Sequence, residues 1–114
     1  VDDEEGLRLL YKEELEDEGA SVVLASSGPE ALEKIEEGSI DLVLLDIKMP
    51  GMDGVEVLRR VKERLKHLPV ILCTAYPHYK HDFGTWASDA YVVKSSDLTE
   101  LKQTIKEILA KRRT

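Results

Sequence analysis

The sequence predicts an α/β fold in which a parallel sheet is covered by helices on both faces. Segments of helical periodicity alternate along the chain with short apolar runs, which is the pattern of a doubly wound sheet. Three short runs, over residues 42–45, 70–73 and 90–93, are apolar at nearly every position, and the one that leads into Asp46 is typical of a strand buried on both faces. The length of 114 residues suits a single domain with one core.

The first part of the chain predicts two helices separated by a strand. Residues 4–18 have apolar side chains at helical spacing among acidic ones, and residues 20–25 contain three consecutive aliphatics that favour a short strand. Ser27 and Glu30 have the spacing of a capping box, which opens a second helix that Gly38 ends. The apolar face expected of the first helix consists of Leu7, Leu10, Tyr11 and Leu15.

The rest of the chain continues the alternation without repeats, linkers or low-complexity segments. The segment from Tyr76 to Ser88 contains Pro, Gly and several aromatic residues, so it predicts only a short or irregular helix. Before this segment, we expect a strand that ends at Asp46, a helix from about Gly54 to Lys66 and a strand from Pro69 to Thr74. After it, we expect a strand over 90–93 that ends at Lys94 and a last helix opened by Asp97 and Glu100.

Composition excludes several classes of protein. The net charge of −7 argues against nucleic-acid binding through a basic surface, and no apolar run approaches the roughly 18 residues that span a membrane. The first residues lack the basic and apolar regions of a signal peptide. The single cysteine, Cys73, lies in an apolar run and is expected to be a buried hydrophobe, which suits a reducing, cytoplasmic setting.

Polar residues close three of the predicted strands: Asp46, Thr74 and Lys94. Taken singly, each has a commoner structural explanation, namely a turn-opening aspartate, a threonine with β-propensity and a solvated lysine. The carboxyl ends of parallel strands share one edge of the sheet, however, which is where open α/β sheets bind their ligands. Asp2 and Asp3 would end a further strand, of which only Val1 is present. The combination predicts a functional site at this edge.

This combination resembles the receiver domains of two-component response regulators, the family of the chemotaxis regulator and the sporulation phosphorelay proteins. The resemblance implies a flavodoxin-like sheet in the order 2-1-3-4-5 with its first strand almost entirely missing, and one receiver domain over 1–114. It also implies that Asp46 accepts a phosphoryl group. The motifs that carry it are Val1-Asp2-Asp3-Glu4, the stretch from Leu44 to Gly54, Thr74-Ala75 and Tyr91-Val92-Val93-Lys94.

The resemblance further implies a metal ion beside the phosphoryl acceptor. Carboxylates about 4 Å apart repel by roughly 1 kcal/mol in water and more when buried, so a cluster of them needs a cation. Mg²⁺ suits such hard oxygen ligands, and Mn²⁺ can replace it. By resemblance, Asp3 and Asp46 bind the metal directly, Asp2 acts more through water, and the backbone carbonyl of Lys48 supplies another oxygen.

Other positions take their roles from the same resemblance. Lys94 and the Thr74 hydroxyl contact the phosphoryl group, and the small Ala75 leaves access to it. Tyr91 follows Thr74 in the switch, although it also fits an ordinary half-buried strand aromatic. The long side chains of Lys48 and Tyr76 shape water access and resemble those of slow-hydrolysing members, which predicts a long-lived phosphoryl-aspartate.

The function expected is that of a signalling module that catalyses only its own phosphorylation and dephosphorylation. Its partners would be a histidine kinase or phosphotransfer protein and a downstream effector or fused output domain, without direct contact to nucleic acid or membrane; a dimer is compatible with this role. One alternative is a degenerate receiver that binds partners independently of phosphorylation. A flavodoxin-like cofactor binder is disfavoured because no Gly-rich phosphate loop follows the strands.

Two departures from the family pattern lead to further expectations. Ser95 replaces the usual proline after Lys94, so the Lys94–Ser95 bond should be trans, because a cis bond without proline costs about 3–4 kcal/mol. The missing first strand would be central in the sheet, so we expect a hole between the second and third strands and displacement of Asp2 and Asp3. Residues missing before Val1 would explain the short first strand most simply. A strand supplied by another chain, or a rearranged sheet, is the alternative explanation.

Overall fold

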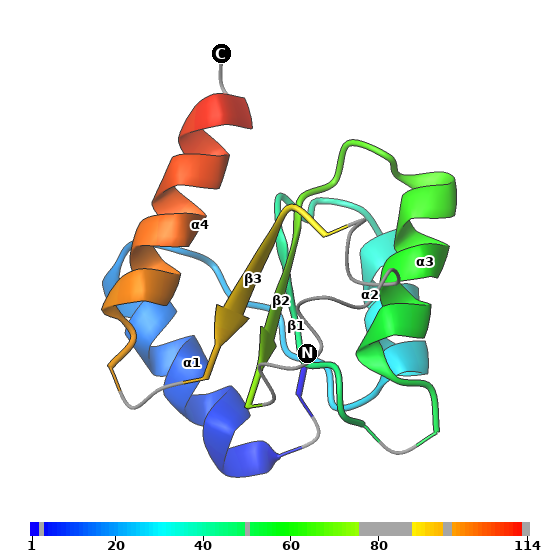
Figure 1. The fold of residues 1–114 in the computed structure, drawn as a ribbon, viewed down its shortest axis with the longest axis horizontal. Helices are drawn as coiled ribbons and strands as arrows, with labels where there is room; N and C mark the ends of the chain where they lie inside the picture. Colours follow the sequence, from blue (N-terminus) through cyan, green and yellow to red (C-terminus); the bar gives the residue numbers. More distant parts are fainter. Residues whose placement is uncertain (3, 50, 76–87, 95–96, 113–114) are drawn as a thin grey trace.

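The structure, a computed structural model, describes residues 1–112 apart from residues 3, 50, 76–87 and 95–96 (Figure 1). The predicted bond geometry at Lys94–Ser95 and the predicted irregular helix at 76–88 therefore lie outside the described residues, Ser88 excepted. The described elements, in order, are α1 (Glu5–Asp17), α2 (Gly28–Glu36), β1 (Val43–Leu45), α3 (Gly54–Arg64), β2 (Val70–Thr74), β3 (Ala90–Val93) and α4 (Thr99–Arg112).

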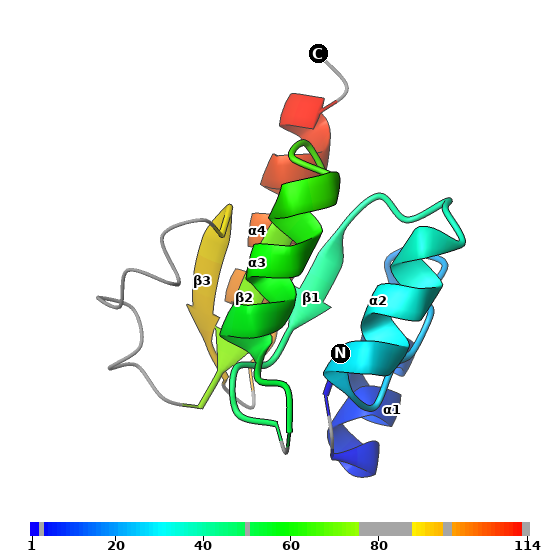
Figure 2. The same cartoon turned by 90° about the vertical axis from the view of Figure 1, so that its right-hand side faces the viewer.

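The described strands form a parallel sheet in the order β1-β2-β3. Val43 pairs with Val70, and Thr74 pairs with Val93, so all three strands point toward the same edge. Helices α1 and α4 cover one face of the sheet, and α2 and α3 cover the other (Figures 1 and 2). The predicted layered α/β architecture is confirmed, and β1 to β3 correspond to the third, fourth and fifth predicted strands.

Successive residues of each strand contribute to opposite faces, as the period of a strand requires. On the side of α2 and α3, Leu45 and Leu72 belong to a core cluster with Leu58. On the side of α1 and α4, Ile71 and Val92 pack with Leu101. All five residues of β2 are buried, which explains the uninterrupted apolar sequence of this strand. Cys73 is buried among them, as predicted.

The amino-terminal helix agrees with its prediction except for one side chain. Tyr11 is buried and Leu7 is partly buried in the α1–α4 layer, but Leu10 is 41% exposed. Leu7 and Tyr11 are four residues apart and face the sheet together, whereas Leu10, which was predicted on the same apolar face, lies beside this stripe and is exposed. Gly19 ends the helix with a φ of +92°, a conformation that glycine adopts at little cost.

The caps of α2 and α3 follow from local sequence. The Ser27 hydroxyl accepts a hydrogen bond from the Glu30 backbone N–H at 3.3 Å, as the capping box predicts, and the Glu30 carboxylate reaches back to the N–H of Ser26. At the start of α3, Asp53 accepts from the N–H of Glu56 at 3.0 Å. Helix α3 ends at Arg64, two residues before the predicted end.

The strand predicted over residues 20–25 is not a strand in the structure. The segment belongs to no ladder among the described residues. Among the described residues, Val1 and Asp2 alone lie between this segment and β1. The backbone N–H of Asp2 donates to the Ala25 carbonyl at 3.1 Å, and the backbone N–H of Asp46 donates to the Val1 carbonyl at 3.0 Å. A strand needs a partner along its length, and here two residues are too few.

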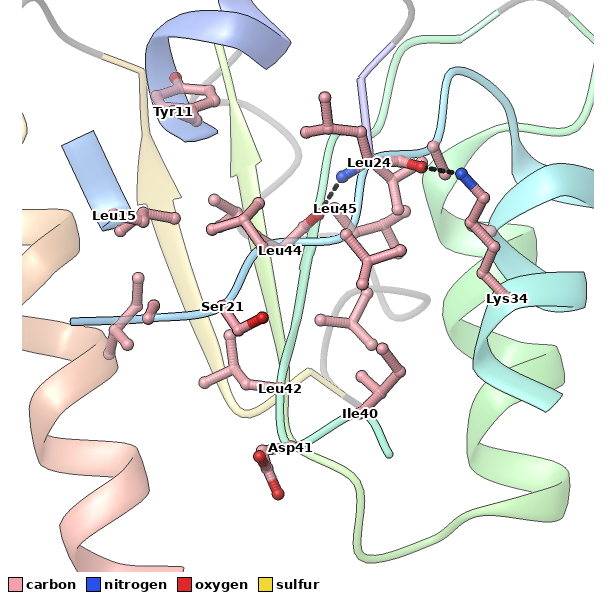
Figure 3. A pocket seen from close by; sticks show the side chains of 18 of the residues that line it. Tyr11, Leu15, Ser21, Leu24, Lys34, Ile40, Asp41, Leu42, Leu44 and Leu45 are labelled. Atoms are coloured by element: carbon pink, nitrogen blue, oxygen red, sulfur yellow. Dashed lines mark hydrogen bonds between the residues drawn. The ribbon is translucent and has the colours of Figure 1, made fainter. Parts of the chain in front are cut away.

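A cavity of about 440 Å³ occupies the space between residues 20–25 and β1 (Figure 3). Its position corresponds to the hole predicted between the second and third strands. None of the described helices is long and apolar enough to cross a membrane.

Candidate functional site

Asp46 directly follows β1 and is only 6% exposed. Its backbone N–H donates to Val1, which fixes it in the sheet, and the loop after it turns back so that the Gly54 N–H donates to the Ile47 carbonyl at 2.8 Å. Gly54 lies so close that a Cβ placed there would overlap the Asp46 carbonyl oxygen. The first turn of α3 therefore packs against the backbone of Asp46 and restricts its position.

Asp2 approaches Asp46 from the amino terminus and is 3% exposed. One of its carboxylate oxygens accepts from the Glu4 backbone N–H at 2.9 Å. The Arg8 guanidinium donates to the Asp2 backbone carbonyl at 2.8 Å. Contacts from α1 and from residues 25 and 46 hold this short segment in place, so that Asp2 lies beside Lys94 and the displacement expected for Asp2 stays a prediction. Asp3 lies outside the described residues.

Lys94 joins the two acids. Its Nζ lies 2.7 Å from Asp2 Oδ2 and 3.1 Å from Asp46 Oδ2, and its side chain is 14% exposed. The backbone N–H of Lys94 donates to the Thr74 carbonyl at 2.6 Å, so the ends of β2 and β3 are tied together below the ammonium group. Residues from three distant parts of the chain thus meet at one edge of the sheet.

Burial and charge act in opposite directions on these groups. Burial raises the pKa of Asp46 above its ordinary value, and the hydrogen bond and charge of Lys94 oppose this shift without cancelling it. Burial alone would lower the pKa of Lys94, but its hydrogen bonds to Asp2 and Asp46 outweigh burial and raise that pKa. Lys94 is therefore held in its cationic form and faces two carboxyl groups.

The remaining predicted positions lie around this cluster at different depths. Thr74 is fully buried at the end of β2, whereas Ala75 is exposed immediately after it. Lys48 is exposed on the loop after Asp46. Tyr91 is half-buried on β3 and packs on the core cluster beneath α2 and α3. Tyr76 is outside the described residues.

Two contributors to the site were missed by the analysis of the sequence. Arg8 holds the backbone of Asp2, but the residue lies among other charged residues of an amphipathic helix, and no local signal indicates this contact. Gly54 packs against the Asp46 backbone. The Asp53-Gly54 pair at a helix start could have indicated it, because a glycine there permits close approach of another backbone.

The donor set suits a hard divalent cation. In the described residues, Asp2 and Asp46 are the buried carboxylates, and Lys94 supplies one positive charge against them. Buried carboxylates that share a single cation leave uncompensated negative charge, which a metal with oxygen preference would offset. No group of three potential metal-binding side chains occurs among the described residues, which do not include Asp3.

Comparison with known proteins identifies close relatives of this chain. A family model for the response regulator receiver domain matches residues 1–106. Sporulation initiation phosphotransferase F of Bacillus subtilis is 35% identical over 111 residues, which cover 96% of this chain and 90% of that protein. The transcriptional regulatory protein YkoG of the same organism is 40% identical over 112 residues. That match covers 96% of this chain but 49% of the relative, so the chain spans about half its length.

Solved structures show the same fold. The response regulator protein TrrA of Thermotoga maritima, in complex with Mg²⁺-BeF, superposes with a TM-score of 0.93 at 48% identity, covering 95% of this chain and 94% of the other. A structure of the histidine kinase ThkA in complex with TrrA matches with a TM-score of 0.91 at 49% identity, covering 96% and 94%.

Proposed function

Because the chain belongs to the family of response regulator receiver domains, we propose that it accepts a phosphoryl group on Asp46 within a two-component or phosphorelay system. The observation that carries the proposal is the position of Asp46, which is buried at a strand end beside Asp2 and Lys94. The donor would be the phosphohistidine of a histidine kinase or of a phosphotransfer protein. The complex of TrrA with ThkA supports a kinase as donor.

The transfer exchanges one bond to phosphorus for another. An Asp46 carboxylate oxygen attacks phosphorus, the bond from phosphorus to the histidine nitrogen breaks, and the imidazole leaves with its electron pair. The product is an acyl phosphate on Asp46. Burial disfavours the ionised form that must attack, and the adjacent Lys94 ammonium favours it, so Lys94 keeps the nucleophile available.

Lys94 and Thr74 would stabilise the transferred group. Negative charge on the phosphoryl oxygens is the main obstacle to this reaction, and catalysis consists largely of positioning and neutralisation. The Lys94 Nζ already lies 3.1 Å from Asp46 and can contact a phosphoryl oxygen without a large movement. Thr74 ends the neighbouring strand, where its hydroxyl can donate to the same group, and the small, exposed Ala75 leaves room for it.

We propose Mg²⁺ as the metal, with Mn²⁺ as a substitute. Asp2 and Asp46, the Lys48 backbone carbonyl and Asp3 would hold it, and the metal would neutralise and orient the phosphoryl oxygens. The Mg²⁺-BeF complex of TrrA supports this assignment. The unbalanced charge of two buried carboxyl groups beside one ammonium is the feature of this chain that favours it.

Phosphorylation would alter the surface of β3 and α4. It adds about −1.5 to −2 charges at Asp46, and an inward movement of the Thr74 hydroxyl would let Tyr91 follow. Tyr91 is half-buried on β3, the strand next to β2, and this position beside Thr74's strand supports the role proposed for it. Moving such a two-state balance from 1:99 to 99:1 requires about 5.5 kcal/mol of differential stabilisation.

The acyl phosphate would be long-lived, because Lys48 and Tyr76 would limit the access of water to it. Lys48 is exposed beside Asp46, which suits this role. Phosphorylated protein freed of donor should keep its phosphoryl group well beyond seconds at neutral pH. Release of inorganic phosphate within seconds would contradict this assignment.

Membership of the family supports a proposal for the cellular role. We propose a cytoplasmic module that receives a signal from a kinase and passes it to a downstream effector or a fused output domain, with or without dimerisation and without binding nucleic acid itself. Relatives such as YkoG are about twice as long as this chain and are transcriptional regulators, which supports an output beyond the receiver domain.

Intact mass after incubation with Mg²⁺ and acetyl phosphate tests the proposal. The parent protein should gain the mass of one phosphoryl group, and Asp46→Asn should gain none. Asp53→Asn is the matched control: it makes the same chemical change on an exposed helix cap, where asparagine also caps well, and should be phosphorylated normally. Absence of a mass gain in the parent would instead favour a receiver that acts independently of phosphorylation.

A further inference from the structure

We propose that Arg8 is a positioning residue for the metal site: by holding the backbone of Asp2, it sets the direction of the Asp2 carboxylate and thereby the affinity of the site for Mg²⁺. The observation that carries this inference is the hydrogen bond from Arg8 Nη1 to the Asp2 carbonyl oxygen, 2.8 Å long. The inference rests on the metal site described under the proposed function, and it does not depend on transfer of the phosphoryl group.

Arg8 reaches Asp2 because of its place at the start of α1. The helix begins at Glu5, so Arg8 lies in the first turn, where its own N–H donates to the Glu4 carbonyl at 3.1 Å. Side chains of a helix tilt toward its amino terminus, which directs the long Arg8 side chain back over the residues that precede the helix. Arg8 is half-buried, so its charge-assisted hydrogen bond is partly shielded from water and is stronger for it.

The contacts of Asp2 divide between its backbone and its carboxylate. The backbone N–H donates to the Ala25 carbonyl at 3.1 Å, and the backbone carbonyl accepts from Arg8. The carboxylate Oδ1 accepts from the Glu4 N–H at 2.9 Å, and Oδ2 lies 2.7 Å from the Lys94 Nζ. The backbone is therefore held on both sides of the Asp2 Cα, and the carboxylate projects from it in a defined direction. Arg8 can be altered while Lys94, the proposed contact of the phosphoryl group, stays unchanged.

Charge and position predict opposite effects of Arg8 on the metal. A guanidinium near a cation site repels the cation, so if Arg8 acted through its charge alone, removing that charge would tighten metal binding. If Arg8 acts by positioning Asp2, removing it weakens binding, because Mg²⁺ requires oxygen ligands in near-ideal octahedral geometry. The sign of the change in affinity therefore distinguishes the two roles.

The magnitude follows from the kind of contact. Groups that orient metal ligands through hydrogen bonds typically contribute about 10–100-fold to metal affinity. Arg8 contacts the backbone of Asp2 and not its carboxylate, so we expect the lower end of this range. Loss of Arg8 should weaken metal binding about tenfold.

The experiment measures the affinity for Mn²⁺ in the absence of any phosphoryl donor. Free Mn²⁺ is followed by its electron paramagnetic resonance signal during a titration, and Mg²⁺ is then added as a competitor. Arg8→Met removes the donors and the charge but keeps a long side chain with good helix propensity. Lys12→Met is the matched control, because Lys12 lies one helical turn further along α1, is likewise half-buried, and loses the same charge. Arg8→Lys keeps the charge on a shorter side chain with a single ammonium group.

Binding should weaken about tenfold in Arg8→Met and about threefold in Arg8→Lys, and it should stay within about twofold of the parent in Lys12→Met. Asp46→Asn should lose the binding, which identifies the site. Amide hydrogen exchange gives a readout without metal. The Asp2 N–H, which donates to Ala25, should exchange at least about threefold faster relative to the Val43 N–H in Arg8→Met and at the parental rate in Lys12→Met.

Tighter binding in Arg8→Met, or equal affinities in Arg8→Met and Lys12→Met, would overturn the proposal. A lower melting temperature of Arg8→Met with unchanged Mn²⁺ affinity would also overturn it, since Arg8 would then serve stability alone. If Arg8→Met does not fold, Arg8→Lys decides, and parental affinity in that variant would overturn the proposal. So would a parent protein that binds no Mn²⁺, or an Asp46→Asn variant that binds it as the parent does.

This proposal and the proposed function fail separately. Metal affinity is measured without acetyl phosphate, so it does not require Asp46 to accept a phosphoryl group. A chain that shows the expected order of Mn²⁺ affinities but gains no mass from acetyl phosphate would support the role of Arg8 and contradict phosphoryl acceptance alone.

Discussion

Replacing Gly54 with alanine should destabilise the protein and slow phosphoryl acceptance, because Gly54 is in contact with the backbone of Asp46. A Cβ at this position would overlap the Asp46 carbonyl oxygen and lie 2.8 Å from the Ile47 Cα. Both neighbours are backbone atoms of the segment that leaves β1, and Asp46 is also bonded to Val1. The methyl group can therefore be accommodated only by moving α3 or Asp46.

The magnitude follows from two opposing effects. Forcing an extra methyl group into a packed site costs about 1–3 kcal/mol. Replacing glycine by alanine in a compatible helical position gains about 0.5–1 kcal/mol, partly by restricting the unfolded chain. The net expected loss is about 1 kcal/mol at the middle of both ranges and at most about 2.5 kcal/mol, and a loss of 1 kcal/mol lowers the melting temperature by roughly 5 °C. Since the carboxylate of Asp46, the proposed phosphoryl acceptor, would move, the rate of phosphorylation should fall by about tenfold.

Gly6→Ala is the matched control for this substitution. Gly6 lies in the first turn of α1, is exposed, and has no atom within 4 Å of the position where its Cβ would be. It should gain about 0.5–1 kcal/mol, so the two variants should shift in opposite directions. Urea denaturation followed by circular dichroism gives the stabilities, and intact mass over time with acetyl phosphate gives the rates. Equal stability and equal rates in the two variants would refute the close approach of Gly54 to Asp46.

Three further predictions concern stability. Ser27→Ala should lower the free energy of unfolding, measured by urea denaturation, by about 1 kcal/mol, because it removes the hydroxyl that caps α2 by accepting from the Glu30 N–H. Ser27→Asn should restore most of this free energy, because asparagine also caps helices. Asp89→Ala should lower the free energy of unfolding by about 1 kcal/mol, because the Asp89 carboxylate accepts from the Val70 N–H at 2.7 Å at the start of β2. Unchanged stability would show that this hydrogen bond does not stabilise the strand. Hydrogen bonds from Arg59 and Arg60 lower the pKa of Glu56 from 4.5 to about 2, so the contribution of Glu56 to stability is present above pH 4.5 and is lost as the pH falls toward 2. Glu56→Gln should therefore flatten the dependence of the unfolding free energy on pH in that window. Parallel pH profiles for the two proteins would contradict the shift.

The parts of the fold that sequence analysis predicted well are those determined by short apolar runs. Each of β1, β2 and β3 comes from a run apolar on both faces, and the polar residue that ends each run could be placed at one edge because parallel strands share their direction. Asp46 and Lys94 meet for this reason, although they are 48 positions apart in the chain.

The parts that sequence analysis missed depend on tertiary contacts. Residues 20–25 have the composition of a strand, but a β-ladder forms only where a partner strand lies alongside. Val1 and Asp2 lie beside this segment only at its carboxyl end, where Asp2 bonds to Ala25. Leu10 follows the helical period as well as Tyr11 does, yet the rotation of α1 on the sheet leaves it exposed. The contact of Arg8 with a backbone carbonyl likewise has no local signal.

The two faces of β2 have a consequence for how the protein unfolds. Leu72 packs into the layer beneath α2 and α3, and its neighbour Ile71 packs into the layer beneath α1 and α4. These residues are adjacent in a five-residue strand, so neither layer can lose its central contacts while the other keeps them. The two halves of the molecule should therefore melt as a single cooperative unit, with equal calorimetric and van't Hoff enthalpies.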